Sequence, residues 1–118
     1  MLEQNSETDD VENDVAELEE KLQEIKNQEG IIGYILRSEK SASIDLKDPT
    51  KMIDYALLSS TVFDLSQNMT ENLQMDEVNS IVVESEETKI LSMNIDNHRL
   101  SLFMEKHVNH DKLCKKLK

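Results

Sequence analysis

The pattern of apolar and polar residues predicts a helix near the N-terminus of the chain. Apolar residues recur there at intervals of four, three, four and three residues: Val11, Val15, Leu18, Leu22 and Ile25. This spacing places one apolar stripe along a helix over residues 11–26, whose other faces are mostly Glu, Asp, Lys and Gln. We therefore predict an amphipathic helix that lies on a sheet, preceded by a disordered acidic tail over residues 1–10.

The two glycines of the chain, Gly30 and Gly33, lie just after this helix. Gly30 stands where a left-handed residue commonly ends a helix. Gly33 falls inside an extended segment, residues 31–37, where a missing side chain indicates a bulge or a close approach. A phosphate-binding loop would need its glycines between a strand and a following helix, with a lysine and a hydroxyl residue after them. The order here is reversed, so we predict a joint between elements and no nucleotide site.

Residues 31–37 are β-branched and aromatic, and residues 41–46 alternate, so we predict two strands joined through Ser38, Glu39 and Lys40. Asp48 and Pro49 then predict the N-cap and first turn of a long helix. The apolar residues of this helix spread over more than one face: Met52, Ile53, Ala56, Leu57, Val62, Phe63 and Leu65. Such a helix needs two partners, and we expect its own sheet and a second subunit or bound protein. The alternative is that residues such as Tyr55, Leu58 and Met69 are scattered surface apolars.

After the long helix the apolar period changes from that of a helix to that of a strand. Residues 77–86, 88–96 and 97–106 read as three strands with short polar connections, which predicts an antiparallel meander. Apolar residues alternate in the last two of these strands, so we expect each to turn one face to the core. Residues 109–118 predict a short closing helix with Leu113 and Leu117 four positions apart.

Composition narrows the class of protein. The chain has 118 residues, enough for one domain over residues 11–118, and a net charge of −12. Such an acidic surface repels phosphates, so nucleic-acid binding is not expected, even though residues 106–118 are net basic. The single cysteine, Cys114, excludes an internal disulfide and favours a reducing compartment. No apolar run suggests a leader or a membrane span, so we expect a cytoplasmic protein.

Two groups of residues were candidates for chemistry. His107, His110 and Cys114 are spaced i, i+3 and i+7, which on a helix would place three zinc-ligand side chains along one face near Asp111. There is no second cysteine pair, so zinc binding stays an alternative. Residues 59–61, Ser-Ser-Thr, lie inside a predicted helix without the glycines of a nucleophile elbow. We therefore expect no catalytic residue and no cofactor.

The order of the predicted elements resembles the roadblock family, the dynein-light-chain and GTPase-regulator fold, over about residues 11–118. The similarity rests on the acidic-faced helix ending in "EG", the strand "IIGYIL" behind it, the helix opening at "DP", and the closing "VNSIVVESEETKILSMNIDNHRLSLFME". The first hairpin departs from the family, whose turn is often Asp-Gly where this chain has Ser-Glu-Lys. The resemblance implies an α+β fold with a five-stranded antiparallel sheet, order 2-1-5-4-3. It also implies that the long helix covers one face and the first and last helices the other.

The same resemblance implies a non-catalytic dimeric scaffold that binds and modulates a Ras-like small GTPase. Members of the family pair through the long helix and the third strand, as homodimers or as heterodimers with a related roadblock subunit. For this chain we expect the dimer or partner interface at Met52, Ile53, Ala56, Leu57, Ser60, Phe63, Ile81, Val82 and Val83. The third strand carries no proline and few charges, so nothing in it protects an edge from pairing.

The two arginines of the chain, Arg37 and Arg99, each stand near the end of a predicted strand. This position indicates a solvent-exposed or salt-bridging role and not that of an arginine finger. A rival function is that of a longin- or profilin-like adaptor in trafficking or cytoskeletal assembly. Longin modules begin with a strand, so the helix predicted ahead of the first strand argues against that alternative.

Overall fold

The computed structural model describes residues 16–73 and 79–117. Residues 16–26 form the N-terminal helix, and the following elements are β1 (Ile31–Arg37), β2 (Ala42–Leu46), the 3₁₀ turn η1 (Pro49–Lys51), α2 (Met52–Asn72), β3 (Ser80–Glu84), β4 (Thr88–Ile95), β5 (His98–Glu105) and α3 (His110–Leu117). The predicted order of elements is therefore confirmed. The predicted acidic tail, residues 1–10, and the first part of the predicted first helix, residues 11–15, lie outside the described residues.

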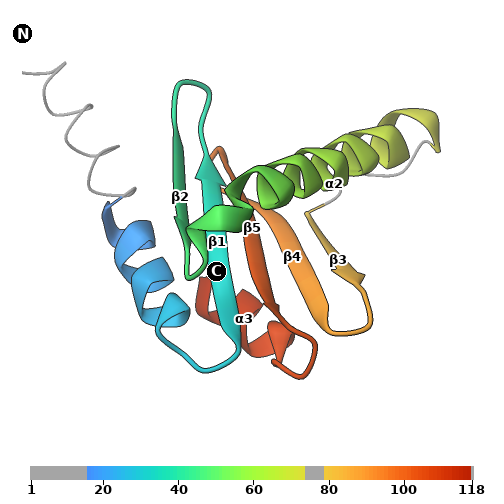
Figure 1. Cartoon of the computed structure of the whole chain (residues 1–118). Coiled ribbons are helices and arrows are strands. Elements are labelled where there is room, and N and C mark those ends of the chain that lie inside the picture. Colours follow the sequence, from blue (N-terminus) through green and yellow to red (C-terminus); the bar gives the residue numbers. More distant parts are fainter. Residues whose placement is uncertain (1–15, 74–78, 118) are drawn as a thin grey trace, which may run out of the picture.

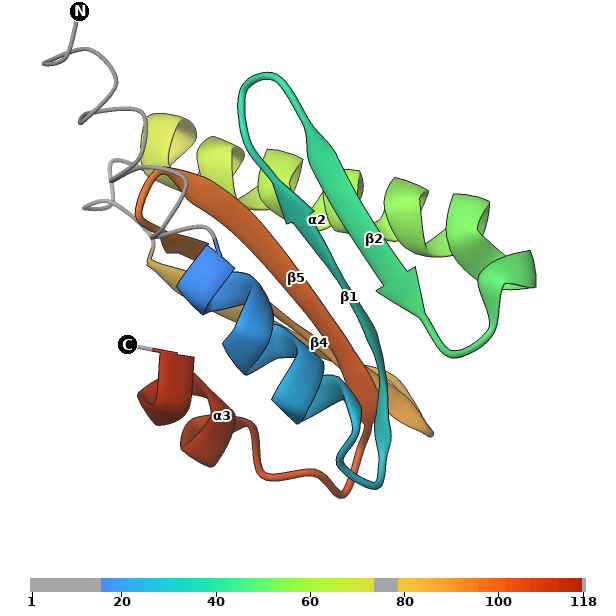
Figure 2. The same ribbon diagram turned by 90° about the vertical axis from the view of Figure 1, so that its left-hand side faces the viewer.

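The strands form one antiparallel five-stranded sheet in the order β2-β1-β5-β4-β3, as predicted (Figure 1). Strands β2 and β3 are the two edges. Helix α2 crosses one face of this sheet, whereas the N-terminal helix and α3 lie side by side on the other (Figure 2). The result is a three-layer arrangement in which both faces of the sheet are covered.

Each face of the sheet has its own hydrophobic cluster. On the side of the N-terminal helix and α3, thirteen buried residues pack together: Leu18, Leu22, Ile25, Ile31, Tyr34, Leu36, Leu91, Met93, Leu100, Leu102, Met104, Leu113 and Leu117. The cluster under α2 is smaller and consists of Ile35, Leu46, Val62, Ile90 and Phe103. The expectation that β4 and β5 turn only one face to the core is wrong. They are central strands between two helical layers, so even Ser92 and Ser101, which face α2, are buried.

Gly30 and Gly33 both lie at irregular points of the backbone, but only Gly33 does so in the way that the sequence predicts. The N-terminal helix already ends at residue 26, so Gly30 does not stop it; Gly30 ends the turn into β1, with φ of +88°. A Cβ there would lie 2.6 Å from a methyl group of Val108. Gly33, with φ of +155°, lies where the β1–β5 register shifts, and a Cβ would lie 2.4 Å from the carbonyl oxygen of Asp45. The predicted bulge and close approach are therefore confirmed at Gly33.

Local hydrogen bonds explain how the connections turn. The Asp48 carboxylate accepts a bond from the backbone N–H of Thr50 (3.1 Å), which confirms the predicted N-cap, although the first turn is the 3₁₀ turn η1. In the β4–β5 hairpin Asp96 and Asn97 both have positive φ, as a two-residue type I′ turn requires. Both turns lie at the surface; the first starts α2, and the second fixes the register of β4 and β5.

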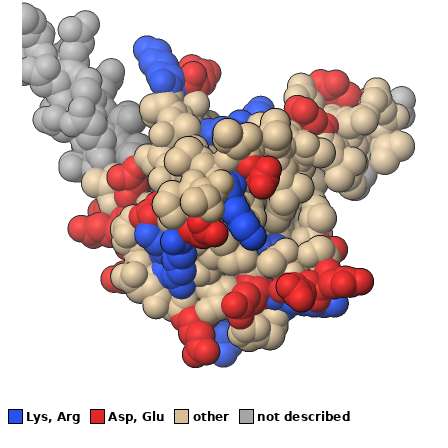
Figure 3. All heavy atoms as spheres, in the orientation of Figure 1, with Lys and Arg blue, Asp and Glu red and all other residues tan. Residues whose placement is uncertain are grey.

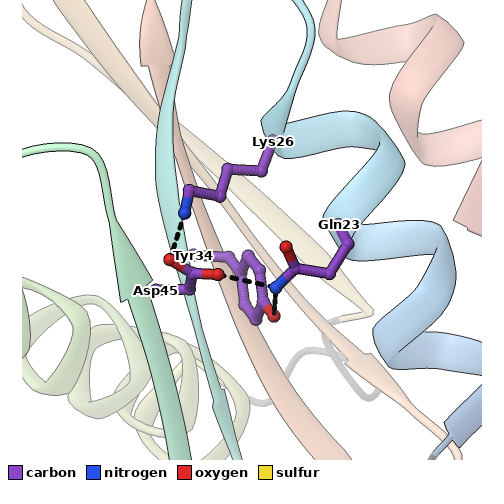
Figure 4. Close-up of polar contacts among 4 residues, drawn as sticks. All are labelled: Gln23, Lys26, Tyr34 and Asp45. Atoms are coloured by element: carbon purple, nitrogen blue, oxygen red, sulfur yellow. Dashed lines mark hydrogen bonds and ion pairs between the residues drawn. The ribbon is translucent and has the colours of Figure 1, made fainter.

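A polar network fastens the N-terminal helix to β1 and β2 (Figure 4). The Gln23 side-chain amide donates to the Tyr34 hydroxyl (2.9 Å) and to the Asp45 carboxylate (2.6 Å), and Lys26 forms an ion pair with Asp45. The bonds from Lys26 and Gln23 hold the pKa of Asp45 below its usual value, whereas burial raises the pKa of Tyr34. The network fixes the position of the helix relative to the β1–β2 hairpin.

Candidate interaction surface

Helix α2 is apolar on two faces. Its inner face packs on the sheet through Tyr55, Ala56, Ser59, Val62 and Phe63. Its outer face carries a second apolar set, which we name the outer stripe: Ile53, Leu57, Leu58 and Leu65. Ile53 and Leu57 lie one turn apart and are 75% and 64% exposed. No other described element covers the outer side of α2 (Figure 1), so these exposed apolar side chains have no partner in the described part of the chain.

Small buried serines fix the rotation of α2 on the sheet. The hydroxyl of Ser59, on the inner face of α2, is 2.6 Å from the hydroxyl of Ser101 on β5, which is in turn 3.4 Å from that of Ser92 on β4. These short side chains let the helix approach closely while every hydroxyl keeps a partner. Because Ser59 must face the sheet, Ile53 and Leu57 must face away from it.

Strand β3 offers an open edge beside α2. Its pairing with β4 includes a bond from the N–H of Ser85 to the carbonyl of Thr88. Since bonding direction alternates along an antiparallel pair, the N–H and C=O groups of Ser80, Val82 and Glu84 point away from β4. Val82 and Val83 are about one-third exposed on opposite faces of the sheet. The edge is therefore free to accept another strand within the described structure.

The structure separates the predicted interface residues into three groups. Met52, Ile53, Leu57, Val82 and Val83 are exposed; Ala56, Ser60 and Ile81 are half-buried; Phe63 is buried. Leu58 and Leu65 are exposed but were left out of the prediction. Their spacing of seven residues puts these two side chains on one helix face, a signal that the prediction did not use.

The two arginines contact α2. Arg37 donates from Nη1 to the Ser60 hydroxyl (3.0 Å) and from Nη2 to the Ala56 carbonyl (3.2 Å). The guanidinium of Arg99 lies 5.4 Å from the centre of the Phe63 ring. Ser60 and Phe63 are therefore not available to a partner protein, because they contact the two arginines that cover one side of α2.

The candidate zinc ligands are dispersed. His107 lies in the turn before α3, near Glu105, so it does not share a helix face with the other two. His110 is the first residue of α3, and its Nδ1 lies 3.0 Å from the ammonium of the buried Lys89. Cys114 packs against the larger hydrophobic cluster. Within residues 16–73 and 79–117 no three His, Cys, Asp or Glu side chains come together to hold a metal.

Comparison with solved structures identifies the architecture. The chain is similar to the Roadblock/LC7 domain from Streptomyces avermitilis, with a TM-score of 0.62 and 16% identity over 84% of this chain and 83% of that one. The chain has the roadblock fold. It also aligns with MglC from Myxococcus xanthus, with a TM-score of 0.49 and 18% identity over 85% of this chain and 89% of that one. No protein-family model matches the sequence, and no curated protein sequence matches it either.

In this roadblock fold the predicted sheet order and the predicted distribution of helices are both confirmed. The helix ahead of β1 is present, which is the feature that argued against a longin-like module. No helix in the part of the chain that the structure describes is long and apolar enough to cross a membrane. Within the described residues the outer stripe and the neighbouring edge of β3 both lack a partner, and so does the edge of β2 at the other side of the sheet.

Proposed function

We propose that this chain is a dimeric, non-catalytic scaffold that binds a Ras-like small GTPase and modulates its nucleotide cycle. The observation that carries the proposal is the outer stripe of α2 beside the open edge of β3. Two copies related by a two-fold axis bury both surfaces at once, and a symmetric interface of this kind is the commonest way in which small domains associate. The roadblock fold supports the GTPase as the further partner, through the resemblance described above.

The register of β3 suits antiparallel pairing with a second copy. Because the bonding groups of Val82 point outward, a two-fold axis at Val82 places it opposite Val82 of the second copy. Ile81 then lies opposite Val83 of the second copy, on the side of α2, and Ser80 lies opposite Glu84. Every apolar residue of the strand meets an apolar residue, and the two glutamates stand at opposite ends of the pair.

The outer stripe adds apolar area to this strand pairing. Burying a fully exposed Leu or Ile side chain is worth about 1.5–3 kcal/mol. Ile53 and Leu57 are more than half exposed, and Leu58 and Leu65 nearly so. Four such side chains in each copy offset a large part of the roughly 4–15 kcal/mol that association costs. A dimer that used the strand edge alone would lack this free energy of apolar burial.

The arginines limit the mechanism by which a GTPase is modulated. Arg37 is held by two bonds to α2, and Arg99 lies over Phe63, so neither is extended to reach a bound nucleotide. The scaffold instead contacts the switch regions of the GTPase and repositions that protein's own catalytic residues. Stimulation of GTP hydrolysis that disappears on Arg37→Ala or Arg99→Ala would contradict this assignment.

The test is binding of purified Ras-like GTPases, loaded with GDP or with a non-hydrolysable GTP analogue, to the immobilised full chain. We expect one GTPase to be retained with a preference for one nucleotide state, and retention to be lost in Leu57→Asp. Lys21→Asp provides a control in which a charge also changes at an exposed helix position, but on the opposite face of the sheet. If no GTPase is retained from a panel covering the Ras-like classes, the GTPase part of the proposal is wrong, whatever the oligomeric state.

A further inference from the structure

Strand β2 is the second open edge of the sheet. The N–H of Lys47 donates to the carbonyl of Ile32 (3.0 Å), which fixes the residues of β2 that bond to β1. Since the bonding direction alternates along an antiparallel pair, three residues of β2 direct their N–H and C=O groups away from β1: Ala42, Ile44 and Leu46. No strand of the described structure pairs with them, so this edge can accept another extended chain.

The same three residues turn their side chains to the side of α2. Ile44 lies opposite Ile35, which belongs to the hydrophobic cluster under α2. Ala42 and Ile44 are exposed, whereas Leu46 is buried. The other two residues of β2 point to the N-terminal helix, where side-chain bonds hold them. The edge is therefore apolar on one face and polar on the other, and a strand that pairs with it must match both faces.

We propose that β2 of a second copy occupies this edge, in an antiparallel pair whose two-fold axis passes through Ile44. Ile44 then lies opposite Ile44 of the second copy, and Ala42 lies opposite Leu46 of the second copy. Apolar residues therefore meet on the side of α2. Because the outward-pointing groups of these residues face each other, the pairing satisfies the backbone groups that β1 leaves free.

Charges at the two ends of this pair are complementary. Just outside the strand, Lys40 stands level with Asp48 of the second copy, and the two-fold axis repeats the contact. Both side chains are exposed, and neither forms an ion pair within the described ranges. The Asp48 carboxylate uses only Oδ1 to cap Thr50, which leaves Oδ2 for the lysine.

Neighbouring registers lack this complementarity. Moving the axis by one residue to Asp45 places two copies of Asp45 opposite each other, and like charges directly opposite destabilise a sheet. Moving it by one residue in the other direction sets Leu46 against Lys40 of the second copy. A shift by two residues either way opposes Ile44 to a charged residue, Asp48 or Lys40. The axis at Ile44 is therefore the favoured register.

The surface around β2 carries charges of both signs. Figure 3 shows Lys or Arg side chains interspersed with Asp or Glu side chains at the left of the molecule, where β2 lies in Figure 1. A net charge of −12 makes copies of this chain repel one another in general. A contact between copies therefore needs a surface without a field of one sign, and the β2 edge meets this condition.

The contact is weaker than the proposed β3 interface. Strand β2 has five residues, and Lys40 and Lys47 stand at its two ends, a feature that limits pairing between sheet edges. Small interfaces are typically weak, so we expect a dissociation constant on the order of millimolar. The β2 contact therefore links the proposed dimers into tetramers at high concentration and leaves them separate in the micromolar range.

The test uses the full chain with Val82→Asp and Leu65→Asp, a background in which both surfaces of the proposed dimer carry a charge. Sedimentation equilibrium should show a monomer at micromolar concentration and a dimer near about 1 mM. Adding Ile44→Asp places two carboxylates opposite each other on the axis and should weaken this dimer by about two orders of magnitude. Leu73→Asp is the matched control, because it adds the same charge at an exposed apolar residue far from β2 (Figure 1), and it should have no effect.

NMR of the same background over a dilution series tests the register. The amide proton shifts of Ala42, Ile44 and Leu46 should move with concentration, because new bonds form at these N–H groups, whereas those of β3 should not. Lys40→Gln should weaken the dimer about two- to fivefold for each ion pair lost. In the registers shifted by one residue Lys40 has no carboxylate opposite it, so an unchanged dimer in Lys40→Gln would overturn the proposed register.

A background that stays monomeric up to about 1 mM would overturn the proposal. So would a dimer that Ile44→Asp and Leu73→Asp weaken equally, or one whose concentration-dependent amide shifts lie in β3. Because the background removes the β3 contact, these outcomes do not depend on whether the proposed dimer forms. The β2 contact therefore stands or falls separately from the proposed function.

Discussion

A charge at Val82 should dissociate the dimer without unfolding the chain. Val82 is 37% exposed at the sheet edge, and exposed substitutions usually change the free energy of unfolding by no more than about 0.5 kcal/mol. In the proposed pairing, Val82→Asp places two carboxylates directly opposite each other, about 5 Å apart. At an effective dielectric constant of 20 their repulsion is about 3 kcal/mol, which weakens the dimer by about two orders of magnitude.

The assay is sedimentation velocity over a hundredfold range of concentration, combined with urea unfolding of each variant. Ile44→Asp is the matched control, because Ile44 is also β-branched, also 37% exposed, and lies on the opposite edge strand β2. We expect Val82→Asp to sediment as a monomer at concentrations where Ile44→Asp remains dimeric. If both variants behave alike, or if Val82→Asp stays dimeric with native stability, the β3-edge interface is wrong.

Three further predictions concern the fold that supports this surface. Gly33→Ala should lower the free energy of unfolding by about 2–4 kcal/mol in urea titrations, since its Cβ would collide with the backbone of β2 at a φ that favours glycine; an unchanged midpoint would contradict the bulge. Ser59→Ala should lower the free energy of unfolding by about 1 kcal/mol, because it removes the shortest hydrogen bond of Ser101. Thr61→Ala, on the exposed side of α2, is the control; an equal loss of stability there would contradict a stabilising role for the Ser59–Ser101 contact. Asp45→Asn should lower stability at pH 7 by no more than about 1 kcal/mol, because the ion pair is partly exposed. As the folded pKa of Asp45 is lowered, that stability is present above about pH 4 and is lost as pH falls through the folded value, so wild-type and variant melting curves should converge in acid.

The apolar periods of the sequence were enough to place the strands and helices. Alternation identified β4 and β5, and Asp48-Pro49 marked the start of the long helix. The order of the strands in the sheet came from the family resemblance, because periodicity does not say which strands are neighbours. The alternation of apolar and polar residues gave the wrong prediction for burial. Ser92 and Ser101 are polar, so their face of the sheet was expected to be exposed, but α2 packs over it and buries them.

The interaction surface was less predictable than the fold. A helix with apolar residues on both faces does not reveal which face meets its own sheet. Phe63 was therefore included in the predicted interface, whereas the structure buries it. The deciding contacts are Ser59 with Ser101 and Arg37 with Ser60, both of which join residues more than twenty positions apart. No local pattern encodes such pairs. The network of Gln23, Tyr34 and Asp45 was missed for the same reason.

The most direct test of the central claim is the solution mass of the purified full chain by light scattering. The account predicts a mass of about twice 13.6 kDa at micromolar concentration, reduced to a single 13.6 kDa in Val82→Asp. A monomer in the wild type at all accessible concentrations would contradict the dimeric scaffold, and the outer stripe of α2 would then need a different partner.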